Sequence, residues 1–185
     1  MTRTIWLLLL PAVAFAHTDG GGTGLMKGLM HPVMGLDHLL AMVSVGVVSS
    51  QMGASHVWRI PGVFVLSMLF GGLLGIFGLP VPMTETGIAL SVLVLGISIL
   101  SGGTGGSDSL VYGVVSLFGI LHGYAHGAEI PRSIGPELYV LGFLFTTSSL
   151  HIFGVILGEM LRNSVPVLRT CGAIVAGTGC IFLLK

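Results

Sequence analysis

Six apolar segments of similar length, separated by short breaks, constrain the fold of this chain more than any other feature. A helix needs about 20 residues to cross the hydrocarbon core of a bilayer. The breaks are rich in Gly, Pro and Ser, which favour turns. The pattern predicts an all-α integral membrane protein, a bundle of about six transmembrane helices in one domain. The expected helices cover roughly residues 31–50, 60–79, 84–101, 109–128, 136–160 and 165–184.

The composition also indicates an integral membrane protein, with the lipid bilayer as one of its partners. Only 8% of the 185 residues are charged, against about 25% in a typical soluble domain. The mean hydropathy is +1.01. The formal net charge is zero, so nothing indicates a nucleic-acid partner. The oligomeric state stays open, a homo-oligomer included. Glycines spaced by four indicate close helix crossings; they are Gly71/Gly75, Gly119/Gly123/Gly127 and Gly154/Gly158.

The N-terminus has the features of a cleaved signal peptide. Arg3 supplies a positive charge, an apolar stretch of about ten residues follows, and Ala14-Phe15-Ala16 fits a cleavage site. We therefore expect residues 1–16 to be removed and residues 17–185 to form the mature transmembrane domain, with its N-terminus outside the cytoplasm. The alternative is a retained, poorly formed first helix. Basic residues are equally numerous on the two expected sides of the membrane, so the positive-inside rule favours neither orientation. The expected orientation is therefore inferred from the signal peptide alone.

The first apolar segment opens with three ionisable residues, His31, Asp37 and His38. Such groups are costly at membrane depth and usually functional. If the segment is one straight helix, the two histidines share a face and His38 lies about 10 Å deeper. Pro32 suits the first turn of that helix. We expect Asp37 to lie beside the histidine stripe.

A second polar stripe lies in the fourth predicted helix, in the sequence "LHGYAHGAE". His122, His126 and Glu129 fall on one helix face because they are spaced i, i+4, i+7. In the expected topology Glu129 lies on the same side of the membrane as His31. Imidazoles bind nickel, cobalt, copper and zinc, and a carboxylate balances the charge of the ion. The two stripes together predict a divalent-metal site, in which the acids are either direct ligands or orient the imidazoles.

Three further residues are weaker candidates for the same metal path. His17, freed by cleavage, would offer an α-amine and an imidazole, although its position after the cleavage site can be incidental. Glu85 would begin the third helix, where an acid also stabilises the helix dipole. His151 either lines the path or bonds to a neighbouring helix.

Successive histidines at different depths favour an ion pathway, because transport needs ligands that bind and then release. We therefore expect a permease that is not an enzyme, with no permanently bound cofactor. One alternative is a membrane zinc hydrolase, since His-x3-His-x2-Glu resembles a catalytic zinc stripe. Another is a haem protein with paired histidine ligands. No nucleotide-binding motif is present, so the chain itself is not an ATPase.

The two motifs resemble those of the HupE/UreJ family of nickel permeases. That family carries H-x5-D-H in its first helix, matched here by His31, Asp37 and His38. It also carries FHGxAHGxE in a later helix, where this chain has Leu121 in place of Phe. The resemblance covers nearly the whole mature chain. It implies a bacterial inner-membrane importer of Ni²⁺ or Co²⁺, with a periplasmic N-terminus, that supplies metalloenzymes such as hydrogenase or urease.

Overall fold

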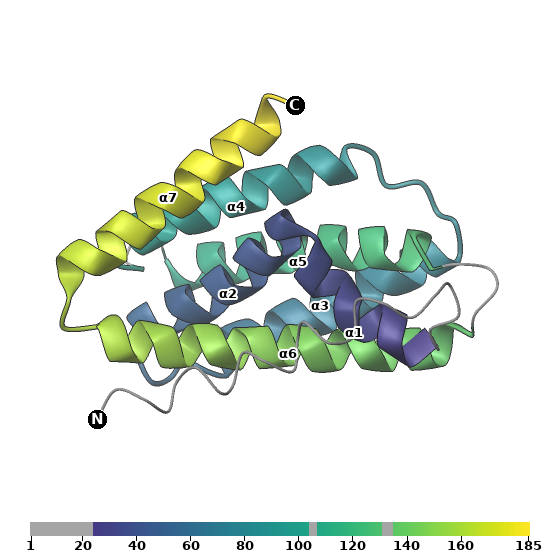
Figure 1. Ribbon diagram of the computed structural model, residues 1–185, viewed down its shortest axis with the longest axis horizontal. Helices are drawn as coiled ribbons and strands as arrows, with labels where there is room; N and C mark the ends of the chain where they lie inside the picture. Colours follow the sequence, from purple (N-terminus) through teal and green to yellow (C-terminus); the bar gives the residue numbers. More distant parts are fainter. Residues whose placement is uncertain (1–23, 104–106, 131–134) are drawn as a thin grey trace, which may run out of the picture.

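The computed structural model describes residues 24–103, 107–130 and 135–185, and these residues form helices and turns without any strand (Figure 1). The predicted signal peptide and His17 lie outside the described residues. The all-α prediction is confirmed for the described part of the chain. Its helices are α1 (Gly24–Met34), α2 (Leu36–Gln51), α3 (Arg59–Ile76), α4 (Thr84–Leu100), α5 (Asp108–Ala128), α6 (Pro136–Leu161) and α7 (Val165–Leu183).

Several of these helices are long and apolar enough to cross a membrane. By length and composition, α3, α5, α6 and α7 qualify among the described residues, and α1 with α2 adds a fifth span if the bent pair counts as one. Helix α4 is also apolar but has only 17 residues. The chain is therefore a multi-pass membrane protein. Six spans remain a prediction, because the sixth requires α4 to cross as well.

The first predicted helix is not straight. It is broken at Gly35 into α1 and α2, which are bent by 79°. Pro32 lies inside α1 rather than opening a helix, and proline removes a backbone donor from a helix interior. Gly35 has extended backbone angles. A Cβ there would lie only 2.9 Å from Asp37 Oδ1 and 3.0 Å from His38 Nδ1. The prediction of one straight helix with both histidines on one face is therefore wrong.

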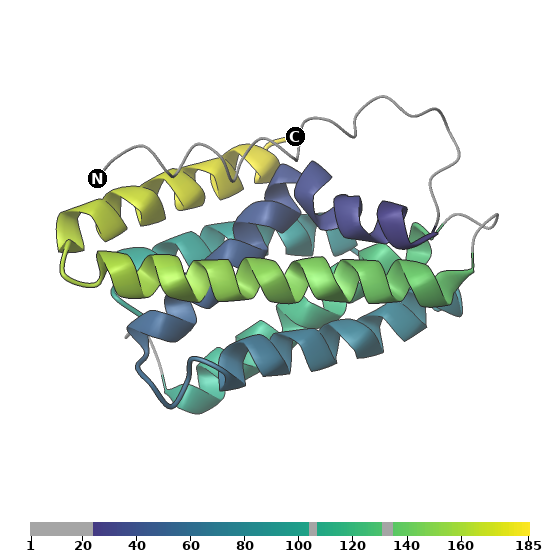
Figure 2. The same ribbon diagram turned by 60° about the horizontal axis from the view of Figure 1, so that its bottom comes forward.

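Close helix pairs build the bundle, and glycines make the close contacts possible. Helix α3 packs on α5, α4 on α7, and α6 on both α1 and α2 (Figure 2). A Cβ at Gly123 of α5 would overlap the Met68 carbonyl of α3, and one at Gly71 of α3 would overlap the Ile120 carbonyl of α5. Gly154 of α6 approaches the backbone of α2 in the same way. The predicted glycine crossings are confirmed at these positions.

The bundle is apolar outside and carries polar groups inside. Leu66, Phe145 and Ile174 are each more than 60% exposed, as expected for side chains that face lipid. The buried polar side chains include four histidines, which are His38, His122, His126 and His151. Since an ionisable residue inside a membrane bundle is rare and usually functional, the interior of the bundle is where a site is expected.

The variant Gly123→Ala is expected to unfold at a lower temperature than the wild type in detergent. The added methyl group would force α3 and α5 apart, and overpacking of this kind costs about 1–3 kcal/mol. Gly113→Ala is the matched control in the same helix, because a Cβ at Gly113 meets nothing within 4 Å. It should unfold at or above the wild-type temperature, since alanine is the better helix former. Equal midpoints for the two variants would contradict the close crossing.

Candidate metal site

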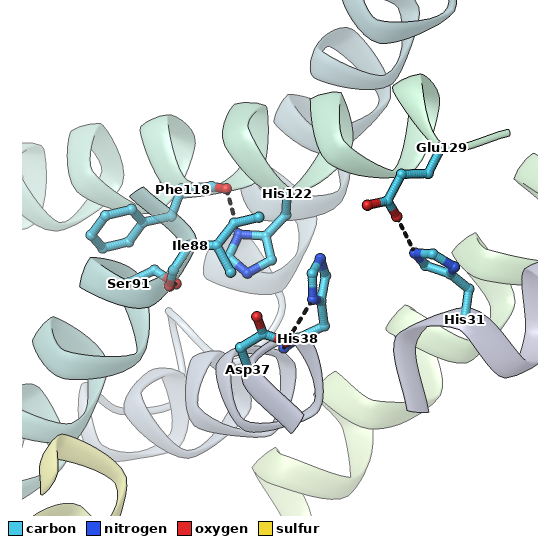
Figure 3. A network of polar contacts seen from close by, with 8 residues as sticks. All are labelled: His31, Asp37, His38, Ile88, Ser91, Phe118, His122 and Glu129. Carbon is cyan, nitrogen blue, oxygen red and sulfur yellow. Dashed lines mark hydrogen bonds and ion pairs between the residues drawn. The ribbon is translucent and has the colours of Figure 1, made fainter. Parts of the chain in front are cut away.

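Four imidazole rings from α1, α2 and α5 form a continuous row, which we call the histidine row. The centroid distances are 4.7 Å from His31 to His126, 4.8 Å from His126 to His38, and 5.2 Å from His38 to His122. Figure 3 shows three of these rings with the polar groups around them. The structure therefore brings together the histidines of both sequence motifs, through the bend between α1 and α2 rather than along one helix face.

Asp37 and Glu129 each bind one histidine ring of the row. Asp37 Oδ1 accepts a hydrogen bond from the His38 backbone N–H at 2.8 Å and is 2.9 Å from His38 Nδ1. Glu129 Oε2 lies 3.0 Å from His31 Nε2. Glu129 follows the last residue of α5, and the hydrogen bond from His31 holds the pKa of its carboxyl below the usual value. Both acids orient an imidazole in this structure, as carboxylates beside metal-binding histidines commonly do.

These hydrogen bonds determine which ring nitrogens are free. His122 Nδ1 donates to the Phe118 carbonyl at 2.8 Å, since a carbonyl can only accept (Figure 3). The carboxylate of Asp37 likewise accepts a hydrogen bond from the Nδ1–H of His38. In the neutral ring the lone pair is then on Nε2. The Nε2 atoms of His38 and His122 are buried without a partner, as are both ring nitrogens of His126.

A concentration of unpaired buried nitrogens is destabilising unless a ligand uses it. Each unsatisfied buried polar group costs about 1–3 kcal/mol. Neutral imidazole nitrogens are ligands for Ni²⁺, Co²⁺, Cu²⁺ and Zn²⁺, so the row fits a divalent transition metal. In the described ranges, no three His, Cys, Asp or Glu side chains are placed to hold one ion together. The row is thus a series of neighbouring positions and not a closed cage.

One end of the row opens at the protein surface. His31 and Glu129 border a cavity of about 290 Å³ that Lys27 and Tyr139 also line. The Glu129 side chain is 50% exposed and that of His31 30% exposed. By contrast, His122 and His126 are fully buried. The row therefore leads from an accessible mouth, defined by His31 and Glu129, into the interior of the bundle.

Aromatic side chains that the sequence analysis did not single out surround the row. The ring of Phe143 stacks on His126 at 5.0 Å, and Tyr139 contacts His31 at 5.8 Å. Phe64 of α3 contacts His122 at 5.5 Å. In the sequence these residues lie in apolar runs and look like lipid-facing aromatics. Only the packing of α3 and α6 in the structure distinguishes them from aromatic residues that face lipid.

The two weaker candidates that the structure describes, Glu85 and His151, do not join the row. Glu85 lies exposed in the first turn of α4, and within the described residues no ring contact or ion pair links it to the four histidines. His151 of α6 is 1% exposed and lies apart from the row, with its ring against Phe64 at 5.1 Å. Of the two that the structure describes, Glu85 and His151, only His151 is buried in the interior.

The apolar helices and the interior histidine row define a multi-pass membrane protein with a candidate metal path. The model of the family described as "HupE / UreJ protein" matches residues 5–182. The chain is 39% identical to Protein HupE of Rhizobium leguminosarum bv. viciae, in an alignment that covers 100% of this chain and 97% of that protein. The chain therefore belongs to the HupE/UreJ family. No solved structure matches it.

Family membership supports a role related to nickel or cobalt transport, with a metal ion and the bilayer as partners. A transporter or accessory role is consistent with the expectation that the chain is not an enzyme.

Addition of Ni²⁺ is expected to raise the unfolding temperature of the wild type but not of His126→Leu. At a free Ni²⁺ concentration of about 100 times Kd, binding stabilises a protein by about 2.7 kcal/mol. The leucine removes two unpaired nitrogens, so without metal this variant should be at least as stable as the wild type. The measurement is thermal unfolding of the purified protein in detergent, with and without Ni²⁺.

His56→Gln is the matched histidine control for this experiment. His56 lies outside the row, where its Nε2 is 3.2 Å from Asp108 Oδ2. This variant should keep the full Ni²⁺-dependent stabilisation. If Ni²⁺ raised the unfolding temperature of His126→Leu as much as that of the wild type, His126 would not be a ligand.

Proposed function

We propose that the chain is a permease that carries Ni²⁺, or Co²⁺, across the bacterial inner membrane and so supplies the maturation of metalloenzymes such as hydrogenase or urease. The observation that carries the proposal is the row of buried imidazoles with unpaired nitrogens, which begins at an accessible mouth. Membership of the HupE/UreJ family supports the choice of metal.

In this proposal the mouth faces the periplasm and captures the ion. The Glu129 carboxylate attracts the cation, and His31 offers the first imidazole. His126 then follows, since its ring contacts both His31 and His38. His38, oriented by Asp37, passes the ion to His122. Neighbouring pairs bind an ion less tightly than a closed cage would, which allows each position to release it to the next.

The two alternative functions fit the site less well. A catalytic zinc needs three protein ligands around one ion, and the described residues bring no three candidate ligands together in that way. A haem needs space for a porphyrin between its two axial histidines. The imidazoles of the row instead contact one another directly, with neighbouring centroids at most 5.2 Å apart.

The variants His38→Ala and His126→Ala are expected to abolish uptake of radiolabelled Ni²⁺ by cells that express the chain. Each removes a link that joins two other rings of the row. His56→Gln should retain wild-type uptake, and immunoblots of membranes should show equal protein levels. Retained uptake by both alanine variants would exclude the histidine row as the path. Competition between Ni²⁺ and Co²⁺ in the same assay identifies the preferred ion, because both accept these ligands.

The apparent affinity for Ni²⁺ is expected to fall as the pH is lowered from about pH 7 to about pH 4. A histidine must be neutral to bind a metal, and its ordinary pKa is about 6.5. Protons therefore compete with the ion, and with more than one imidazole at a position the loss should exceed tenfold per pH unit. The measurement is equilibrium binding of Ni²⁺ to the purified protein across this range, with folding checked by circular dichroism. An affinity that stays constant down to the pH at which the protein unfolds would mean that histidines are not the principal ligands.

A further inference from the structure

His151 is a buried histidine that the histidine row does not include. It lies in α6, is 1% exposed, and both of its ring nitrogens are buried without a hydrogen-bond partner. One helical turn earlier on the same face, the hydroxyl of Thr147 is also buried and unpartnered. A histidine that served only to join two helices would use its nitrogens for hydrogen bonds. These three unpaired polar atoms therefore indicate a ligand.

The ring of Phe64 contacts both His151 and the inner end of the histidine row. Its centroid lies 5.5 Å from that of His122 and 5.1 Å from that of His151. His122 is the last ring of the row as counted from the mouth. His151 thus lies where an ion would arrive after it passed Phe64, and a displacement of one aromatic side chain would join the two positions.

His151 borders an apolar cavity that extends toward the far end of the bundle. This cavity, of about 400 Å³ between α3 and α6, is also lined by Ser148, Pro61 and Leu66 and opens on the side of the bundle that faces lipid. This cavity shares Val57, Trp58 and Val155 with a larger one of about 780 Å³. The larger cavity lies where α2 and α6 end and α3 and α7 begin, which is the end of the bundle opposite to the mouth.

We propose that His151, with the Thr147 hydroxyl beside it, is a second binding position for a divalent transition-metal ion, on the release side of Phe64. This inference rests on the proposed function, since it needs an ion that travels along the histidine row. The position would bind weakly, because one imidazole and one hydroxyl supply only two protein ligands. Weak binding suits a position from which the ion departs.

The test compares three substitutions of His151 in the full chain, reconstituted in liposomes that contain a fluorescent Ni²⁺ chelator. His151→Leu and His151→Gln remove the metal ligand, whereas His151→Cys replaces it with another ligand for the ion. All three should fold, since His151 makes no hydrogen bond that they would lose. The initial rate of Ni²⁺ uptake and the equilibrium affinity of the detergent-purified protein for Ni²⁺ are measured for each, with His56→Gln as the control.

We expect the leucine and glutamine variants to lose at least about tenfold in uptake rate, the lower limit seen when even an outer partner of a metal ligand is removed. Their equilibrium affinity for Ni²⁺ should stay within about twofold of wild type, because the histidine row is intact. His151→Cys should recover part of the rate under reducing conditions.

Wild-type uptake by His151→Leu would overturn the second position. Equal losses in the cysteine and glutamine variants would do the same, because they would assign His151 a packing role. A wild type that neither binds nor transports Ni²⁺ would instead refute the proposed function, and this inference with it. The three results are distinguishable within one set of measurements.

Discussion

The cost of an unpaired polar group inside an apolar bundle is the constraint on which this structure depends. Asp37, Glu129 and the Phe118 carbonyl each satisfy one nitrogen of a different histidine. They leave the opposite nitrogen of His38 and of His122 without a partner, and His126 has none at all. A fold selected only for stability would replace these rings by leucine. Their unpaired nitrogens are the feature from which the proposed metal path is argued.

Close packing along the neighbouring face of α5 makes this arrangement possible. Gly119 and Gly123 bring α5 onto the backbone of α3, while His122 and His126 on the adjacent stripe face α1 and α2. The same close approach places Phe64 of α3 against His122. The glycines around the histidines thus have a structural role, since they fix the distance between the helices that hold the row and the aromatic ring at its inner end.

The sequence predicted the helices well because their length is set by the membrane, and it predicted the glycine crossings because small residues at that spacing have few other uses in a span. It also indicated that His31, His38, His122 and His126 belong together. The break at Gly35 was missed because Pro32 also suits a first turn, so the sequence alone did not decide where the helix began. The sequence left the place of His151 open, because its contact with Phe64 joins residues that are remote in sequence.

The bend between α1 and α2 decides how the row is connected. On a straight helix His31 and His38 would be about 10 Å apart along the axis, whereas in the bent pair their centroids are 6.1 Å apart. His126 contacts both rings more closely than they contact each other. The link from the mouth to the interior therefore runs through α5 and depends on where α1 sits. Gly28 sets that position by packing directly on the backbone of Tyr139 in α6, so a shift of α1 along α6 would separate His31 from both His126 and Glu129.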